Sequence, residues 1–175
     1  KNLFLLLVVG MLFFSCAASI NSSVGPNEIP VNVSDKSMHI AQVVGGESDI
    51  NNILVQADNI DPEEFETALI ESIQNTKLCQ ILQDKDNADF NLEVLIISAT
   101  SMPPVLLNID ANLAVHYKIS SKDRVLFDET ITSTCHKSVG DNFAAVTRWK
   151  AAKAGAIKSN LKQFIEKLDE SEIIQ

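Results

Sequence analysis

Apolar and polar residues alternate along three stretches in the second half of the chain, at about 89–99, 107–119 and 124–134. The middle stretch is the clearest, because its odd-numbered positions are apolar and its even-numbered positions are mostly polar: Ile109, Ala111, Leu113, Val115, Tyr117 and Ile119 against Asn108, Asp110, Asn112, His116 and Lys118. Successive side chains of a strand point to opposite faces of its sheet. The pattern therefore predicts a meander of antiparallel strands with one covered face and one wet face.

Two further strands and two helices are predicted around this meander. Shorter strands are expected at 38–44, before Gly45-Gly46, and at 79–82. Asp61, Pro62 and Glu64 form a helix start with a capping residue, and the helix should run from 62 to about 76 with one apolar stripe: Phe65, Ala68, Leu69, Ser72 and Ile73. A second helix at about 141–168 carries an apolar arc of Phe143, Val146, Ala154, Ile157, Leu161, Phe164, Ile165 and Leu168.

These elements predict an α+β fold. We expect an antiparallel or mixed sheet of four to five strands, with two helices packed on one of its faces. The chain of 175 residues is long enough for one such domain with a real core. We place that domain at 38–175.

The first fifteen residues have a different pattern. Lys1 precedes a run of twelve uncharged, almost wholly apolar residues from 3 to 14, shorter than the ~20 that a membrane-spanning helix requires. Such a run is typical of a secretion signal that is later removed, so we assign residues 1–15 to a signal peptide. Residues 16–37 are rich in Ser, Asn, Pro and Gly, which predicts a flexible tether.

The end of the signal, Leu12-Phe13-Phe14-Ser15-Cys16, resembles a bacterial lipobox. The resemblance implies that Cys16 is the acylated first residue of the mature protein; it departs from the usual motif in having Phe13 where Leu is typical. Ala17 and Ala18 lack the acidic residue that implies retention in the inner membrane, which favours the outer membrane, facing the periplasm. The alternative is a plain secretory signal cut near residues 17–19, which would leave a soluble periplasmic or secreted protein.

The net negative charge of the chain argues against some classes of binding partner. The chain has 14 basic and 23 acidic residues, and 13 against 23 once Lys1 is removed with the signal. An acidic protein of this kind is unsuited to nucleic acid and to electrostatic attachment to anionic lipid. We therefore expect membrane attachment through acyl chains, and several chains hold a protein stably where one does not.

The sequence contains few candidates for catalytic residues. Cys135-His136 is the one Cys-His neighbour pair, but adjacent residues of a strand face opposite ways, so His136 cannot serve as base to Cys135. His39, His116 and His136 lie on separate elements without metal-ligand spacing. No phosphate-binding loop, nucleophile elbow or zinc motif occurs in the chain. We therefore predict no catalytic residue, no metal site and no cofactor.

Cys79 and Cys135 are the cysteines that remain after Cys16, in a compartment that permits disulfides. A bond between them would close a long loop and stabilise the fold by up to ~4 kcal/mol. Each also lies among apolar neighbours, which favours two separate buried thiols.

Glu129 and Lys150 form the other candidate pair. Glu129 shares parity with Val125, Phe127 and Ile131, and Lys150 lies within the apolar arc of the last helix. Because an isolated buried charge is costly, we expect a partly buried ion pair. The alternative is that both residues reach water at the margin of the sheet.

A family resemblance rests on fold-determining residues between about 43 and 168, namely Phe65, Ala68, Leu69, Ser72, Ile73, Ala88-Asp89-Phe90-Asn91-Leu92, Tyr117, Arg148 to Ala156, Asn160, Phe164-Ile165 and Leu168. The chain resembles small uncharacterised lipoproteins of Gram-negative bacteria. More distantly it is similar to the TolB amino-terminal domain, to penicillin-binding-protein activators and to auxiliary lipoproteins of ABC transporters. These families supply no catalytic residues to carry over.

The resemblance implies a non-catalytic binding or assembly factor of the cell envelope that contacts another envelope protein. A lipid-binding transport auxiliary is one alternative and would require an apolar cleft between helices and sheet. An envelope hydrolase is the other. The sequence leaves the partner's identity and the oligomeric state open.

Overall fold

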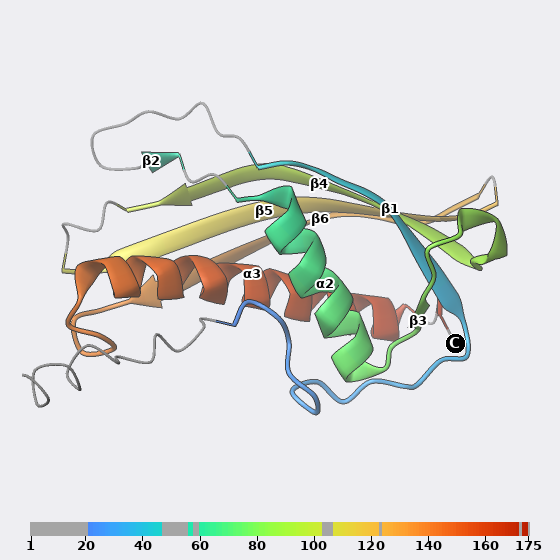
Figure 1. Cartoon of the computed structure of the whole chain (residues 1–175), viewed down its shortest axis with the longest axis horizontal. Coiled ribbons are helices and arrows are strands. Elements are labelled where there is room, and N and C mark those ends of the chain that lie inside the picture. Colours follow the sequence, from blue (N-terminus) through green and yellow to red (C-terminus); the bar gives the residue numbers. More distant parts are fainter. Residues whose placement is uncertain are drawn as a thin grey trace, which may run out of the picture.

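The structure, a computed structural model, describes residues 21–46, 56–57, 60–102, 107–122, 124–171 and 173–174. Its elements are β1 (Ser37–Gly45), β2 (Gln56–Ala57), α2 (Pro62–Thr76), β3 (Gln80–Ile81), a single 3₁₀ turn η1 (Lys85–Asn87), β4 (Phe90–Ser101), β5 (Ile109–Ser121), β6 (Arg124–Lys137) and α3 (Ala145–Glu170). The helices lie together on one side of the sheet (Figure 1). The predicted α+β class is confirmed.

One mixed sheet contains all the strands in the order β3-β1-β4-β5-β6, with β2 paired to the end of β4. The β4-β5-β6 meander is antiparallel, as predicted. β1 runs parallel to both β3 and β4, which makes the sheet mixed. The odd-numbered residues of β5 from Ile109 to Ile119 are all buried. The period-2 pattern therefore identified the covered face correctly.

Local signals fix α2. The Asp61 side chain accepts a hydrogen bond of 3.0 Å from the Glu63 N–H, Pro62 is the first helical residue, and Lys77 ends the helix in the left-handed conformation at φ 58°. The five residues of the predicted stripe are all buried, together with Thr76. This helix matches the prediction residue for residue.

A buried polar junction fixes α3 on the sheet. Asn160 is fully buried; its Oδ1 accepts a 2.7 Å hydrogen bond from the Tyr117 hydroxyl, and its Nδ2 donates one of 2.9 Å to the Ile131 carbonyl. Phe164, one turn further, stacks on the Tyr117 ring with centroids 4.1 Å apart. One residue of α3 is thus bonded to both β5 and β6, which sets the position of the helix along the strands.

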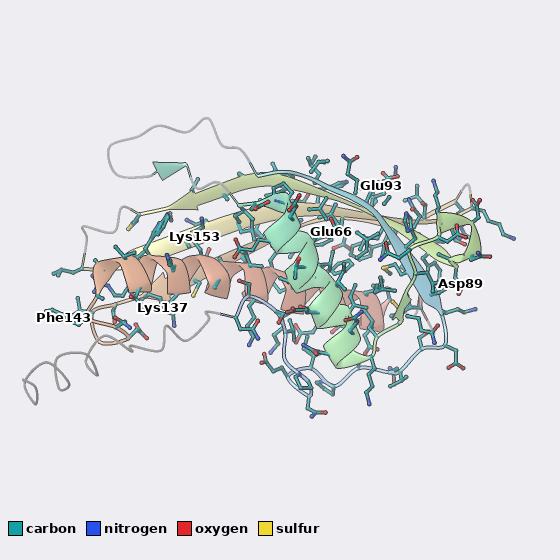
Figure 2. All side chains as sticks on the ribbon, viewed as in Figure 1. Glu66, Asp89, Glu93, Lys137, Phe143 and Lys153 are labelled. Carbon is teal, nitrogen blue, oxygen red and sulfur yellow. The ribbon has the colours of Figure 1, made fainter. Side chains whose placement is uncertain are left out.

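The start of α3 differs from the prediction. Phe143 lies in the turn before the helix and is 89% exposed, and Val146 is 57% exposed, although both were expected on the buried arc. Figure 2 shows Phe143 projecting from the end of the molecule where α3 begins. Arg148 is buried instead, where its Nη1 donates hydrogen bonds of 2.8 Å to the carbonyls of Asn142 and Phe143. The guanidinium binds the turn that precedes the helix, so this end packs through a polar side chain.

Residues 21–36, which we call the stem, also differ from the flexible tether that composition predicted. Val24 is fully buried and its N–H donates a 2.9 Å hydrogen bond to Ser72 Oγ of α2. Further along, Glu28 pairs with Lys158 at 2.7 Å and the Asn32 N–H bonds Asp169 at 2.8 Å, both on α3. The stem therefore lies along the helices before it enters β1. The predicted boundary of the domain at residue 38 remains a prediction.

The Asn160 junction predicts a large effect of a small change. Asn160→Ala would leave the Tyr117 hydroxyl and the Ile131 carbonyl buried without these partners, and we expect the free energy of unfolding to fall by roughly 2–4 kcal/mol. Urea denaturation measures it. Lys150→Ala, on an exposed position of the same helix, should change it by less than about 0.5 kcal/mol. Equal effects of the two variants would contradict the role of Asn160.

A second prediction concerns Asp89, which holds the start of β1 beside β4. Hydrogen bonds from the Ser37 backbone N–H and then from its hydroxyl, both 2.9 Å, lower the pKa of the Asp89 carboxyl. A carboxyl whose pKa is lower in the folded state stabilises the fold above its unfolded pKa, and this contribution is lost as the pH falls through the folded pKa. Near neutral pH, the free energy of unfolding should therefore be higher for the wild type than for Asp89→Asn. This difference should shrink as the pH falls below about 4. A difference that grows on acidification would refute this assignment.

Candidate binding surface

The predicted site residues are dispersed across the structure. Cys16 lies outside the described residues, so lipidation stays a prediction. Cys79 follows α2 at the β3 edge of the sheet, whereas Cys135 lies on β6 at the other edge. Four strand spacings of ~4.8 Å separate these edges, far more than the ~7 Å limit between the Cα atoms of a disulfide. Accordingly, both cysteines carry free thiols.

Neither thiol is suited to nucleophilic chemistry. Burial raises the pKa of Cys79 to about 12, and burial is also the main cause that raises the pKa of Cys135. The thiolate is the reactive form, so both side chains are protonated and inert near neutral pH. Cys135 instead fills the contact between β6 and α3, where a Cβ built on Gly155 would lie 3.2 Å from the Cys135 Cβ and closer still to its sulfur.

Cys135 and His136 face opposite sides of β6, as predicted. Cys135 faces α3, and His136 bonds Asp110 across the other face of the sheet, with 2.6 Å between Nδ1 and Oδ1. Adjacent residues of a strand cannot converge on one substrate.

The predicted pair of Glu129 with Lys150 is wrong. Glu129 Oε2 lies 2.7 Å from Lys167 Nζ, with both side chains nearly half exposed, while Lys150 is exposed elsewhere on α3. The reason is length: Glu129 lies eight residues before the end of β6, about 27 Å of strand, and an antiparallel helix needs about 18 residues to return that far. That estimate reaches the second half of α3, and could have been made from the sequence.

We call the sheet surface opposite the helices the outer face. Across it, side chains of neighbouring strands pair. Two pairs are between register partners: Lys118 with Glu93 at 3.2 Å, and the Thr134 hydroxyl donating to Asn112 at 2.8 Å. The third is diagonal, with His116 Nε2 3.2 Å from Asp128, one step along β6 from its register partner Thr130 on the same face. His116 Nδ1 also lies 3.1 Å from the Thr130 hydroxyl oxygen. Figure 2 shows Glu93 projecting from this side, away from α2 and α3. The outer half of the meander is therefore an ordered polar surface.

Beside this polar surface lie three exposed apolar side chains, which we call the apolar patch. They are Val44, Leu95 and Ile97, with 36%, 44% and 48% of their surface exposed. Val44 is the register partner of Leu95, and Leu95 is in turn the partner of His116. A bulge between Ile96 and Ser98 shifts the parity of β4, which leaves Ile97 outward while Ala99 returns inward. The patch is thus contiguous with the polar pairs on a rigid sheet.

The sequence did not predict this surface. The parity of β5 identified which of its residues face outward, but the pairing partners depend on the strand register and on the bulge in β4, which a single sequence does not specify.

A hollow of about 390 Å³ lies where β6 meets the end of α3. Half of its lining residues are charged, namely Asp128, Glu129, Lys167 and Glu170, and the others are Leu126, Phe127, Ser171 and Ile173. An apolar cleft of the kind expected for a lipid carrier would have a different lining.

The described part of the chain contains no cluster of three or more metal-ligating side chains. In that same part, no helix combines the length and the apolar character needed to cross a membrane.

Comparison with known proteins supports the fold alone. No family model matches the chain, and no curated protein matches its sequence. A Xanthomonas campestris protein of the DUF330 family aligns with a TM-score of 0.56 and 11% identity over 85% of this chain and 91% of that protein. A hypothetical protein of Chlamydia trachomatis aligns with a TM-score of 0.54 and 8% identity over 81% of this chain and all of that protein. A minor lipoprotein of Acinetobacter baumannii aligns more loosely, with a TM-score of 0.49, 11% identity and coverage of 79% of this chain and 94% of that one.

At these identities the shared property is an architecture, and function depends on the site. The relations to the TolB amino-terminal domain, to penicillin-binding-protein activators and to ABC-transport auxiliary lipoproteins remain predictions. The chain therefore shares its fold with a DUF330 protein.

Proposed function

We propose that this protein is a bacterial envelope lipoprotein, anchored through Cys16, that acts as a non-catalytic binding or assembly factor. The observation that carries the proposal is the apolar patch on the outer face. Binding surfaces commonly have an apolar centre and a polar rim, and here Val44, Leu95 and Ile97 adjoin the pairs made by His116 and Lys118. Paired strands of one sheet hold all of these side chains, so little ordering is needed when a partner binds.

The chemistry of the thiols supports a binding role over an enzymatic one. A hydrolase with a cysteine nucleophile needs a thiolate and an adjacent base, whereas burial keeps both thiols protonated and His136 faces away from Cys135. The charged lining of the hollow at the end of α3 likewise supports a protein partner over a lipid cargo.

The packed stem changes what an anchor at Cys16 would do. A flexible tether of about twenty residues would reach roughly 25 Å on average and much further when fully extended. Because residue 21 already lies at the domain, only five residue steps separate it from Cys16, and they span at most about 18 Å. The anchor would hold the domain against the bilayer, at an outer-membrane address that Ala17 and Ala18 favour.

Removal of the anchor tests the location. Cys16→Ser should block acylation and move the protein from the membrane fraction to the soluble fraction, with loss of the envelope phenotype that the wild type complements. The thermal midpoint of the folded domain should not change. Ser19→Ala, three residues away, should stay with the membranes. A Cys16→Ser protein that is processed and fractionates as the parent does would exclude lipidation.

Substitution on the apolar patch tests the binding surface. Leu95→Asp with Ile97→Asp places two carboxylates on the patch and should lower complementation and partner cross-linking at least tenfold, with little change in the thermal midpoint, because both side chains reach solvent. Val33→Asp, at a stem position that is 71% exposed, is the matched control and should behave as wild type. A photo-reactive residue at Leu95 should give a discrete adduct in cells. Full complementation by the double variant would rule out the patch as the binding surface.

A further inference from the structure

β6 ends the sheet with a long edge. It has fourteen residues, and within the described chain only β5 pairs with it. Native edge strands are usually short or are interrupted by charge or proline. The centre of β6, Thr130 to Cys135, contains no charged residue and no proline, and four of its six residues are β-branched. This edge lacks the usual protection against pairing with another strand.

The edge is also accessible. Its outward side chains Asp128, Thr130, Thr132, Thr134 and His136 are all exposed, whereas the outward residues of β5 from Ala114 to Ser120 are partly covered. At the beginning of β6 the hollow beside residues 126–129 leaves space next to the strand. α3 contacts β6 from the inner face, where Asn160 donates to the Ile131 carbonyl and the Ser133 hydroxyl donates to the Ala156 carbonyl. Within the described chain, no strand pairs with the other edge of β6.

We propose that a second copy of this chain pairs with this edge, β6 against β6 in antiparallel orientation, about a two-fold axis at Thr132. Such an axis stands perpendicular to the sheet, so the two outer faces lie on the same side and residues of equal parity lie opposite each other. Thr132 is then opposite its own copy and Thr130 is opposite Thr134 of the second chain. Asp128 is opposite His136, and this contact occurs twice.

Charge complementarity favours this register. A centre at Asp128 or at Glu129 would place a carboxylate opposite its own copy, which is unfavourable. A centre at Thr132 places Asp128 of each chain opposite the His136 imidazole of the other and pairs threonines between these contacts, a combination favoured across strands. On the inner face it places Glu129 opposite Cys135 and Phe127 opposite Lys137, with no like charges facing each other.

The existing side-chain contacts extend naturally into this pairing. His136 already bonds Asp110, and Asp128 already bonds His116, within one chain. Across the axis, Asp110, His136, Asp128 of the second chain and its His116 would form one row of alternating acids and imidazoles. The pairing depends neither on lipidation nor on the apolar patch. It would join two outer faces into one sheet, so that a partner could engage two patches at once.

The oligomeric state of the full mature chain in mild detergent tests the pairing. We expect light scattering to show a concentration-dependent dimer. Thr132→Lys would place two ammonium groups opposite each other at the axis and should raise the dimer dissociation constant about tenfold or more. Gln42→Lys makes a change of the same charge at an exposed position of β1 and should leave the constant unchanged. A chain that is monomeric at every concentration, or a dimer that Thr132→Lys does not weaken, would overturn the proposal.

Cysteine cross-linking tests the register independently. With Cys79 and Cys135 replaced by Ser, Thr132→Cys should form a disulfide-linked dimer rapidly in cells or in detergent, because its own copy lies directly opposite. Thr130→Cys is the matched control, since it is displaced from its copy by four residues, about 13 Å. Preferential linkage through position 132 would support the two-fold axis at Thr132. Equal rates at both positions, or linkage only at 130, would overturn it.

Discussion

The hydrogen bonds of Asn160 are the constraint on which the rest of the arrangement depends. Asn160 is fully buried among the apolar residues of the second half of α3, and its side chain is satisfied only where Tyr117 and the Ile131 carbonyl lie together. A shift of α3 by one turn would leave three buried polar groups without these partners. The helix is therefore fixed antiparallel to β6, which brings Lys167 to Glu129 and removes Lys150 from it. The same placement keeps α3 on the inner face of the meander, so that the outer face remains available.

Where the information is local, the sequence predicted the structure closely. Asp61 and Pro62 set the start of α2 within one turn of chain, and the odd-numbered residues of β5 are buried over the eleven residues from Ile109 to Ile119. The fold class follows from such signals, because one-faced strands and one-faced helices can bury their apolar sides only against each other.

The differences between prediction and structure share one cause. In each case a contact between residues distant in sequence, or an irregularity in the periodic pattern, decides the local structure. Val24 and Ile29 are two apolar residues in a polar segment, and only their contact with the helices shows that the stem is packed. Phe143 and Val146 fit the helical period of α3. The Arg148 side chain, however, binds the turn that precedes the helix, and both apolar side chains are exposed. The bulge in β4 reverses the parity after Ile97, so that Ala99 faces inward although it shares the parity of the outward Glu93 and Leu95. An argument from periodicity takes no account of such contacts or of a bulge.

The packed stem also bears on the kind of partner that the outer face can meet. The stem contacts Ser72 of α2, and Lys158 and Asp169 of α3, so the chain approaches the domain from the helix side, as the blue segment beneath the helices shows (Figure 1). With Cys16 acylated and no more than about 18 Å away from residue 21, the bilayer would lie nearer to the helices than to the far face of the sheet. The apolar patch would then point away from its own membrane. On the proposed function, an apolar surface held in that direction would meet a protein partner, whereas a surface used to take up lipid from the same membrane would be expected on the opposite side of the domain.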